Sequence, residues 1–294
     1  MTQVIGPVVG FGEILWDLFP SGKQPGGAPF NFTFHCHQLG AQAVMVSRVG
    51  QDPLGEELLS RVHGLGLEDS FIQRDARCPT GTVTVELSSG GIPSYTITPE
   101  VAWDHVEWNE ELAKLASSAS TICFGSLCQR NTTTRQTLRR FLAQAKKAIR
   151  VFDVNLRQQF YSREILDESL KASNWAKVNE EEIEILDELL GLRGETVEES
   201  LEVLRRRYAL DLVALTLGEN GCRVHTGNEK FQVPGLRSRV ADTVGAGDSF
   251  TGALLVGKLR GKPNREAAIM ANKMAARVVE KVGGTPKVEV GDLK

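Results

Sequence analysis

Apolar and polar positions alternate with two different periods along this chain, and these periods predict its elements. Residues 8–18 and 44–49 are rich in β-branched and apolar residues, which is typical of strands. A helical pattern follows each strand, over 30–39 and 55–63, and a glycine ends each helix. A turn and a glycine-rich loop are expected over 20–29. This succession of strand and helix indicates a parallel sheet.

The second half of the chain repeats the alternation. The predicted strands cover residues 121–124, 151–155, 176–178 and 212–216. The predicted helices cover residues 109–117, 132–148, 163–172, 180–190 and 197–208. A hairpin over 222–233 and two closing helices, one after Asp248 and one over 265–281, complete the pattern. We therefore predict an α/β fold with a doubly wound, mainly parallel sheet flanked by helices.

One stretch breaks this rhythm and predicts a separate hairpin. Polar and apolar side chains alternate over 80–89, a turn follows at 88–91, and residues 94–98 are again strand-like. Strands that alternate so clearly usually have one face in water or over a ligand. We expect a small β lid formed by strands within about 13–20 and 80–99. Its apolar face could meet a second subunit, so a homodimer through the lid is a further expectation.

Composition limits the classes of function. The 294 residues include 41% apolar ones, carry a formal net charge of −3 and have a pI near 6.0. A surface that leans acidic argues against nucleic acid or an anionic membrane as a partner. The five cysteines form no C-x-x-C pair, which favours a reduced, cytoplasmic location. We expect no signal peptide or transmembrane span, because the sequence has neither a basic N-terminal region nor a long apolar run.

A stretch near the end of the chain combines small residues with an acid. Residues 242–252 contain Gly245, Ala246, Gly247 and Asp248 and lead into a helical pattern. The first N–H groups of a helix lack partners and the helix dipole is positive there, so this loop suits a phosphate. The acid is either a base that takes a proton from a hydroxyl or a helix cap, and the loop alone leaves both open. The sequence has no P-loop, dinucleotide-binding or G-x-S-x-G motif, so a phosphate-handling enzyme would use this loop.

Eight motifs occur in the order in which one enzyme family has them. The two signatures are Gly26-Gly27-Ala28-Pro29 with Asn31, and the loop from Asp242 to Asp248. The others are Gly12-Glu13 with Asp17, Val49-Gly50-x-Asp52-x-x-Gly55, Pro79-Thr80-Gly81, Asp153-x-Asn155-x-Arg157, Asn179-x-x-Glu182 and Thr216-x-Gly218-x-x-Gly221. The chain resembles the ribokinase-like (PfkB) carbohydrate kinases, and most of all the bacterial fructokinases. This resemblance implies a single kinase domain over residues 1–294.

The resemblance also implies catalytic and sugar-binding roles. Asp248 would be the base that orients the sugar hydroxyl and takes its proton late in phosphoryl transfer. The anion hole would be formed by Gly245, Ala246 and Gly247. The sugar would be bound by Asp17, Gly26, Gly27, Asn31, Arg157 and Asp248. Arg157 would also reach the transferred phosphate. Phe30 departs from the small residue that is usual at its position, which weakens the choice of sugar.

Nucleotide and cation sites follow from the same resemblance. Contacts to ATP are implied for Asn179, Thr216, Gly218, Gly221, Gly245, Gly247 and Asn272. Glu182 would hold Mg²⁺ through water, although it stands in an acidic run that could be only a solvated helix face. Asp242 would help bind a monovalent cation such as K⁺, or it is a turn residue. Asn272 could equally be a polar position on a helix surface.

The expected activity is ATP-dependent phosphorylation of D-fructose to fructose 6-phosphate. Two alternatives stay open. One is a kinase of this family for 2-keto-3-deoxygluconate, another hexose or a nucleoside. The other is a catalytically silent sugar-binding protein on this fold. The loop over 26–31 has no basic residue for a keto acid, and a silent protein would have little need for Asp248.

Overall fold

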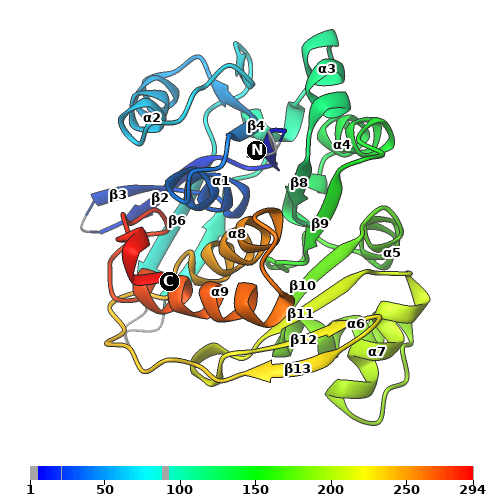
Figure 1. Ribbon diagram of the computed structural model, residues 1–294. Helices are drawn as coiled ribbons and strands as arrows, with labels where there is room; N and C mark the ends of the chain where they lie inside the picture. The colour runs from blue at the N-terminus through cyan, green and yellow to red at the C-terminus, as the bar shows by residue number, and fades with distance from the viewer. Residues whose placement is uncertain (1–5, 21, 88–92, 294) are drawn as a thin grey trace.

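A large sheet runs through the centre of the molecule. The computed structural model describes residues 6–20, 22–87 and 93–293. The sheet has nine strands in the order β13-β12-β11-β10-β9-β8-β1-β4-β5. Their bounds are β1 Val8–Phe11, β4 Ala43–Gly50, β5 Ile72–Asp75, β8 Thr121–Phe124, β9 Ile149–Asp153, β10 Trp175–Asn179, β11 Leu212–Thr216, β12 Cys222–Thr226 and β13 Lys230–Val233. All neighbours pair in parallel except the β11–β12–β13 edge (Figure 1). The predicted doubly wound sheet is confirmed.

Helices cover both faces of this sheet. One face carries α3 (Glu110–Ser118), α4 (Thr132–Gln144), α5 (Arg163–Lys171), α6 (Glu180–Leu190) and α7 (Val197–Arg207). The other carries α1 (Ala28–Gln38), α8 (Ala246–Leu259) and α9 (Asn264–Val278), as Figure 1 shows. A smaller apolar cluster joins α2 (Pro53–Gly64) to β4. Neighbouring residues of β1 serve different faces, because strand side chains alternate: Val8 packs under α1 and Val9 under α4. None of the described helices has the length and apolar run needed to cross a bilayer.

Most of the described α-helices have a side-chain cap at their first turn, whereas α1, α8 and α9 have none. A side chain accepts an N–H of the first turn at Asp52, Asn109, Asn131, Ser162, Asn179 and Thr196. Each such cap contributes about 1 kcal/mol. Gly27 precedes α1 and Gly245 precedes α8, and neither has a side chain to accept such a bond. These two helices meet at the site described below.

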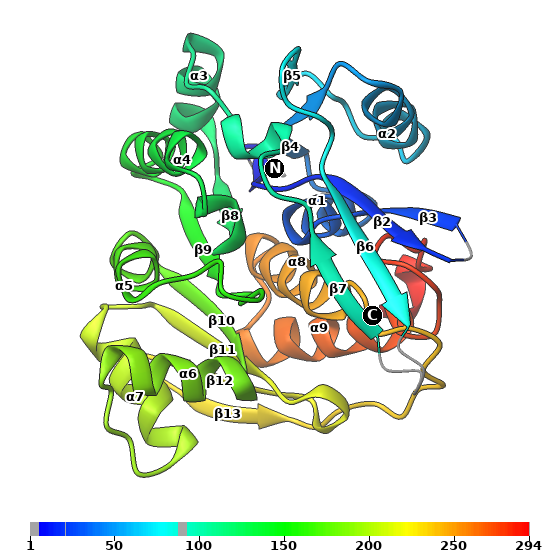
Figure 2. The ribbon, with the colours of Figure 1, turned by 180° about the vertical axis from the view of Figure 1, so that it is seen from behind.

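A second, smaller sheet stands apart from the first (Figure 2). Its four strands lie in the order β3-β2-β6-β7. Their bounds are β2 Leu15–Phe19, β3 Gly22–Gly26, β6 Thr82–Leu87 and β7 Pro93–Ile97. This sheet is the predicted β lid, with β3 in addition, where we expected a turn and a loop. The edge of β2 explains the difference, because β3 pairs along its whole length with that edge. The turn predicted over 88–91 lies outside the described residues.

Several predicted boundaries were wrong. The strand predicted over 8–18 is two strands, because the backbone at Gly12, with φ of +145°, breaks it. One piece stays in the main sheet and the other enters the lid. Gly245 starts α8 in a left-handed conformation, so the helix begins at Ala246 and includes Asp248. β5 was not expected, because its Ile-Gln-Arg-Asp sequence has a single apolar residue. Smaller shifts affect α4, β9 and α9, which were predicted over 132–148, 151–155 and 265–281.

Candidate active site

The first turns of α1 and α8 meet near the carboxyl ends of the central strands. Asn31 donates a hydrogen bond from Nδ2 to Oδ2 of Asp248 at 2.8 Å, across 217 positions of sequence. Asn31 is 3% exposed, whereas Asp248 is partly open to solvent. The fold thus brings a predicted sugar ligand into contact with the predicted base. This edge is where ligands bind in open α/β sheets.

The glycine turn before Asp248 is tightly packed. Gly245 has φ of +77°, and a Cβ atom on it would lie 2.6 Å from the carbonyl oxygen of Gly284. A side chain at this position would therefore collide with backbone. Of the three predicted anion-hole residues, Ala246 already donates its N–H to the carbonyl of Thr243 at 3.3 Å. A Cβ atom on Gly247 would lie 3.0 Å from Nζ of Lys177, so a cation stands beside the turn.

The surroundings of Asp248 change its acidity. Burial raises the pKa of Asp248 to about 6, and repulsion from Asp153 adds to this effect. The hydrogen bond from Asn31 and the charges of Lys177 and Arg157 act in the opposite direction. The carboxyl is mainly ionised at neutral pH and is a stronger proton acceptor than an ordinary aspartate. Both properties suit a general base.

The cation beside the glycine turn belongs to a buried network that sequence reasoning missed. Nζ of Lys177, on β10, lies 3.1 Å from Oδ1 of Asp153, and Thr251 donates to the other carboxylate oxygen at 3.0 Å. Desolvation opposes the charge of this lysine, but attraction to Asp153, Glu182 and Asp248 outweighs it and raises the pKa of Lys177. The lysine is therefore charged. A lysine inside an otherwise apolar predicted strand was the available signal.

The lid side of the site contains two carboxyl groups, of which Asp17 is half-buried and Glu13 is fully buried. Burial raises the pKa of Asp17, on β2, to about 7, while Arg157 lowers it and Asp242 and Asp248 raise it. A Cβ atom on Gly26 would lie 2.1 Å from Oδ2 of Asp17, so a side chain there would displace this carboxylate. Gly27 is constrained by backbone, with φ of +108° and a Cβ position 2.4 Å from the carbonyl oxygen of Glu13. Glu13 itself is 1% exposed and lies under this loop.

Arg157 lies in the loop that follows β9. Asn155 turns this loop with φ of +40°, a conformation that asparagine tolerates, and its carbonyl accepts a bond from Ser126. Arg157 is exposed and donates to the carbonyl of Leu156 at 3.1 Å. It is close enough to lower the pKa of Asp17 and of Asp248. The predicted sugar ligands Asp17, Asn31, Arg157 and Asp248 thus surround one region.

Glu182 has a structural task in this fold. It completes a capping box at the start of α6, in which Oε2 accepts the N–H of Asn179 and the amide oxygen of Asn179 accepts the N–H of Glu182. Its Oε1 accepts the N–H of Leu156 at 3.1 Å. The side chain is almost fully buried, so a magnesium-bound water would need a second lone pair of an oxygen already in use. The magnesium role of Glu182 therefore stays a prediction.

A cleft of about 1150 Å³ lies on the other side of the glycine turn. Four of the predicted anion-hole and nucleotide residues line it: Gly218, Gly221, Ala246 and Asn272. Leu236 and Val240 add apolar surface at 47% and 61% exposure. Asn179 and Thr216 lie one residue before Glu180 and Leu217, which line the cleft. A cleft of this size, with apolar walls and an amide, can accommodate a nucleotide.

The other loop beside the glycine turn is held by Asp242. Its Oδ1 accepts the N–H of Val244 at 3.0 Å, and its Oδ2 accepts the N–H of Gly283 at 2.9 Å. These bonds tie the glycine turn to the loop after α9. Within the described residues no group of three or more His, Cys, Asp or Glu side chains could hold a metal ion. The cation role of Asp242 stays a prediction.

The sequence matches the model of one family of enzymes. The family model described as pfkB family carbohydrate kinase matches residues 3–290. The chain belongs to the pfkB family of carbohydrate kinases. The expected family and enzyme class are thereby confirmed: it is a phosphotransferase with an alcohol group as acceptor.

Several relatives of this pfkB carbohydrate kinase match almost its whole length. A protein of Pyrococcus horikoshii named as a sugar kinase is 31% identical, covering 98% of this chain and 95% of that protein. Its crystal structure matches with a TM-score of 0.85, covering 98% and 96% of the two chains. Fructokinase-1 of Oryza sativa subsp. japonica is 29% identical, covering 98% and 96%. A crystal structure of a Xylella fastidiosa fructokinase with bound ATP has the same fold, at a TM-score of 0.85, 21% identity and coverage of 95% and 94%.

Proposed function

We propose that this pfkB kinase transfers the γ-phosphoryl group of ATP to D-fructose and forms fructose 6-phosphate. The contact between Asn31 and Asp248 carries the proposal, because it joins the sugar side of the site to the glycine turn at the nucleotide cleft. Relatives named fructokinase support fructose as the acceptor. The complex of the Xylella fructokinase with ATP supports ATP as the donor in this fold.

The side chains suggest how the transfer proceeds. Asp248 orients the sugar hydroxyl and accepts its proton as the bond to phosphorus forms, since phosphoryl transfer has a loose transition state. The start of α8 and the charge of Lys177 beside it would stabilise the negative charge that develops on the transferred group. Arg157, in the loop that follows β9, is close enough for its charge to act on Asp248 as well. Bound magnesium would neutralise charge on the nucleotide phosphates. A closed lid would keep water away from the phosphoryl group.

Charge around the site favours a neutral sugar over a sugar acid. Asp17, Asp248, Glu13 and Asp242 surround the region, and Arg157 is the cation that acts on three of these four groups. Lys177 is already paired with Asp153. An anionic substrate such as 2-keto-3-deoxygluconate would add a further negative charge to this acidic site. Fructose would instead use the carboxylates as hydrogen-bond acceptors.

The first test measures ADP release with ATP and Mg²⁺ on fructose, glucose, mannose, ribose, 2-keto-3-deoxygluconate and adenosine. We expect fructose to have the highest kcat/KM.

Asp248→Asn should lower kcat by about a thousandfold, as for the loss of a general base, without changing ATP affinity measured by calorimetry. Asp211→Asn, at an exposed carboxylate, is the matched control and should have normal kinetics. Turnover in Asp248→Asn equal to that of the unsubstituted enzyme would refute the mechanism. ATP binding without turnover of any acceptor would favour the silent sugar-binding alternative.

The proposal also includes activation by potassium and a homodimer formed through the lid. We expect activity to fall when K⁺ is replaced by tetramethylammonium, and unchanged activity would remove Asp242 from cation binding. We also expect two copies to associate through the lid, which sedimentation analysis of the purified protein would detect.

A further inference from the structure

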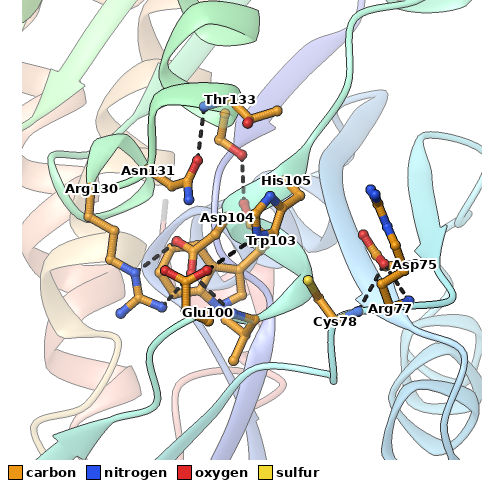
Figure 3. Close-up of polar contacts among 12 residues, drawn as sticks. Asp75, Arg77, Cys78, Glu100, Trp103, Asp104, His105, Arg130, Asn131 and Thr133 are labelled. Carbon is orange, nitrogen blue, oxygen red and sulfur yellow. Dashed lines mark hydrogen bonds and ion pairs between the residues drawn. The ribbon is translucent and has the colours of Figure 1, made fainter.

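The side chain of Arg130 is buried where the lid joins the main sheet. It follows the short helix η2 (Leu127–Gln129). Its Nε and Nη2 atoms donate to the two carboxylate oxygens of Asp104, in the short helix η1 (Ala102–His105), at 2.8 and 2.7 Å (Figure 3). The two side chains are only 8% and 2% exposed. Such a bidentate pair fixes the plane of the guanidinium group as well as its charge.

The same guanidinium group holds the base of the lid. Nη2 of Arg130 also donates to the carbonyl oxygen of Thr98 at 2.7 Å, directly after the lid strand β7. Thr98 in turn donates its N–H to the carbonyl of Thr82, and their hydroxyl groups lie 2.7 Å apart. Thr82 begins the lid strand β6. One buried side chain therefore anchors the point at which both strands leave the main domain.

The guanidinium group also contacts two aromatic rings. Its central carbon lies 4.1 Å from the ring centre of Trp103 and 4.9 Å from that of Phe160. Phe160 belongs to the loop that carries Arg157, and its N–H donates to the carbonyl of Arg157 at 3.1 Å. Cation–π contacts are stronger when they are shielded from water. Arg130 thus touches both the base of the lid and the turn that presents Arg157.

We propose that Arg130 is a positioning residue, which holds the base of the lid and the Arg157 loop at a fixed separation. The proposal rests on the function proposed above, in which lid and Arg157 approach the sugar from different sides. Within the part of the chain that the structure describes, the hydrogen bonds of Arg130 involve no residue that lines the cleft beside the glycine turn. Its loss should therefore affect the sugar step and leave ATP binding unchanged.

The test uses two variants at this contact. Arg130→Lys keeps the charge but loses the bidentate bond and the flat stacking surface. Phe160→Leu leaves the ion pair intact and removes the ring on the Arg157 loop. Both should lower kcat/KM for the sugar by about ten- to a hundredfold, as displaced reacting groups do, with unchanged KM for ATP. Phe160→Leu decides the question if Arg130→Lys does not fold.

A matched control separates positioning from stability. Arg48 forms another buried pair, with Asp75 at 2.8 Å, and donates to the carbonyl of His105 at the end of η1. Among the residues that the structure describes, none of the polar contacts of Arg48 involves Thr98 or Phe160. Arg48→Lys should lower the melting temperature and leave the kinetic constants for the sugar unchanged. In the double variant, Arg130→Lys should reduce kcat/KM for the sugar little further than Arg157→Lys alone does. Both substitutions act through the guanidinium group of Arg157, so their effects should not add.

Hydrogen exchange gives a readout that needs no turnover. In Arg130→Lys and Phe160→Leu, the amides of Leu156 and Phe160 should exchange faster, and in Arg48→Lys they should not. Faster exchange in these two variants would support the positioning role, whether or not a sugar is phosphorylated. A lack of turnover with every sugar would instead count against the proposed function. Normal sugar kinetics and normal exchange in Phe160→Leu would overturn the proposal. Strictly additive effects of Arg130→Lys and Arg157→Lys would overturn it as well.

Discussion

Glu13 provides the sharpest test of the electrostatics of this site. The residue is 1% exposed, and its Oε2 has no hydrogen-bond partner among the described residues. Burial raises the pKa of Glu13 from 4.5 to about 7. The N–H of Glu13 itself lowers it, Asp248 raises it, and Arg157 and the N–H of Ala28 lower it. The folded protein therefore holds this proton more tightly than the unfolded chain does.

The raised pKa makes the free energy of unfolding depend on pH. The contribution of Glu13 is fully present below pH 4.5, the value in the unfolded chain, and is lost as pH rises through about 7. One pKa unit corresponds to about 1.4 kcal/mol, so ionisation costs the folded state about 3 kcal/mol above pH 7. Glu13→Gln cannot ionise and avoids this cost. The free energy of unfolding of Glu13→Gln, minus that of the unsubstituted protein, should therefore rise by about 3 kcal/mol from acidic to alkaline pH.

Guanidinium denaturation of both proteins at several pH values between 5 and 8.5 measures this difference. Any effect of the amide on packing is independent of pH and cancels when the two ends of the range are compared. Glu111→Gln removes the same charge from an exposed helix position, and its effect on stability should stay constant over this range. The reasoning would be refuted if the curves for Glu13→Gln and the unsubstituted protein ran parallel from pH 5 to 8.5.

Two further predictions concern the catalytic turn. Because the pKa of Asp248 is about 6 and its carboxylate must be ionised to accept a proton, kcat should fall tenfold per pH unit well below about 6. Asn31→Ala removes a hydrogen bond that lowers this pKa, so the acidic limb should move to higher pH; a flat profile down to pH 5 would contradict the role of Asp248 as base. Gly245→Ala should lower the free energy of unfolding by about 1 to 3 kcal/mol through backbone strain. The loss should exceed that of Gly261→Ala. Both glycines have φ near +78°, but only a side chain at position 245 would also collide with Gly284. Thermal denaturation compares these variants, and equal losses would show that the Gly284 contact is unimportant.

Local patterns in the sequence were sufficient for most strands of the main sheet and for the glycine turn. Periods of apolar residues depend on near neighbours, so the alternation of helices and strands could be predicted. Elements with little pattern of their own were missed. β3 and β5 exist because β2 and β4 offer them an edge to pair with. A sequence of four or five residues does not reveal that edge.

The candidate site divides in the same way. The glycines and the helix start pointed to Asp248 and its turn, because such features leave local signals, and the resemblance to the PfkB kinases pointed to Asn31. Only the tertiary structure brought Asn31 to Asp248, placed the charge of Lys177 beside Gly247 and joined Arg130 to the Arg157 loop. These contacts and the raised pKa values depend on burial and on close approach between distant segments. Neither is a property of any short stretch of chain, so both are decided by packing.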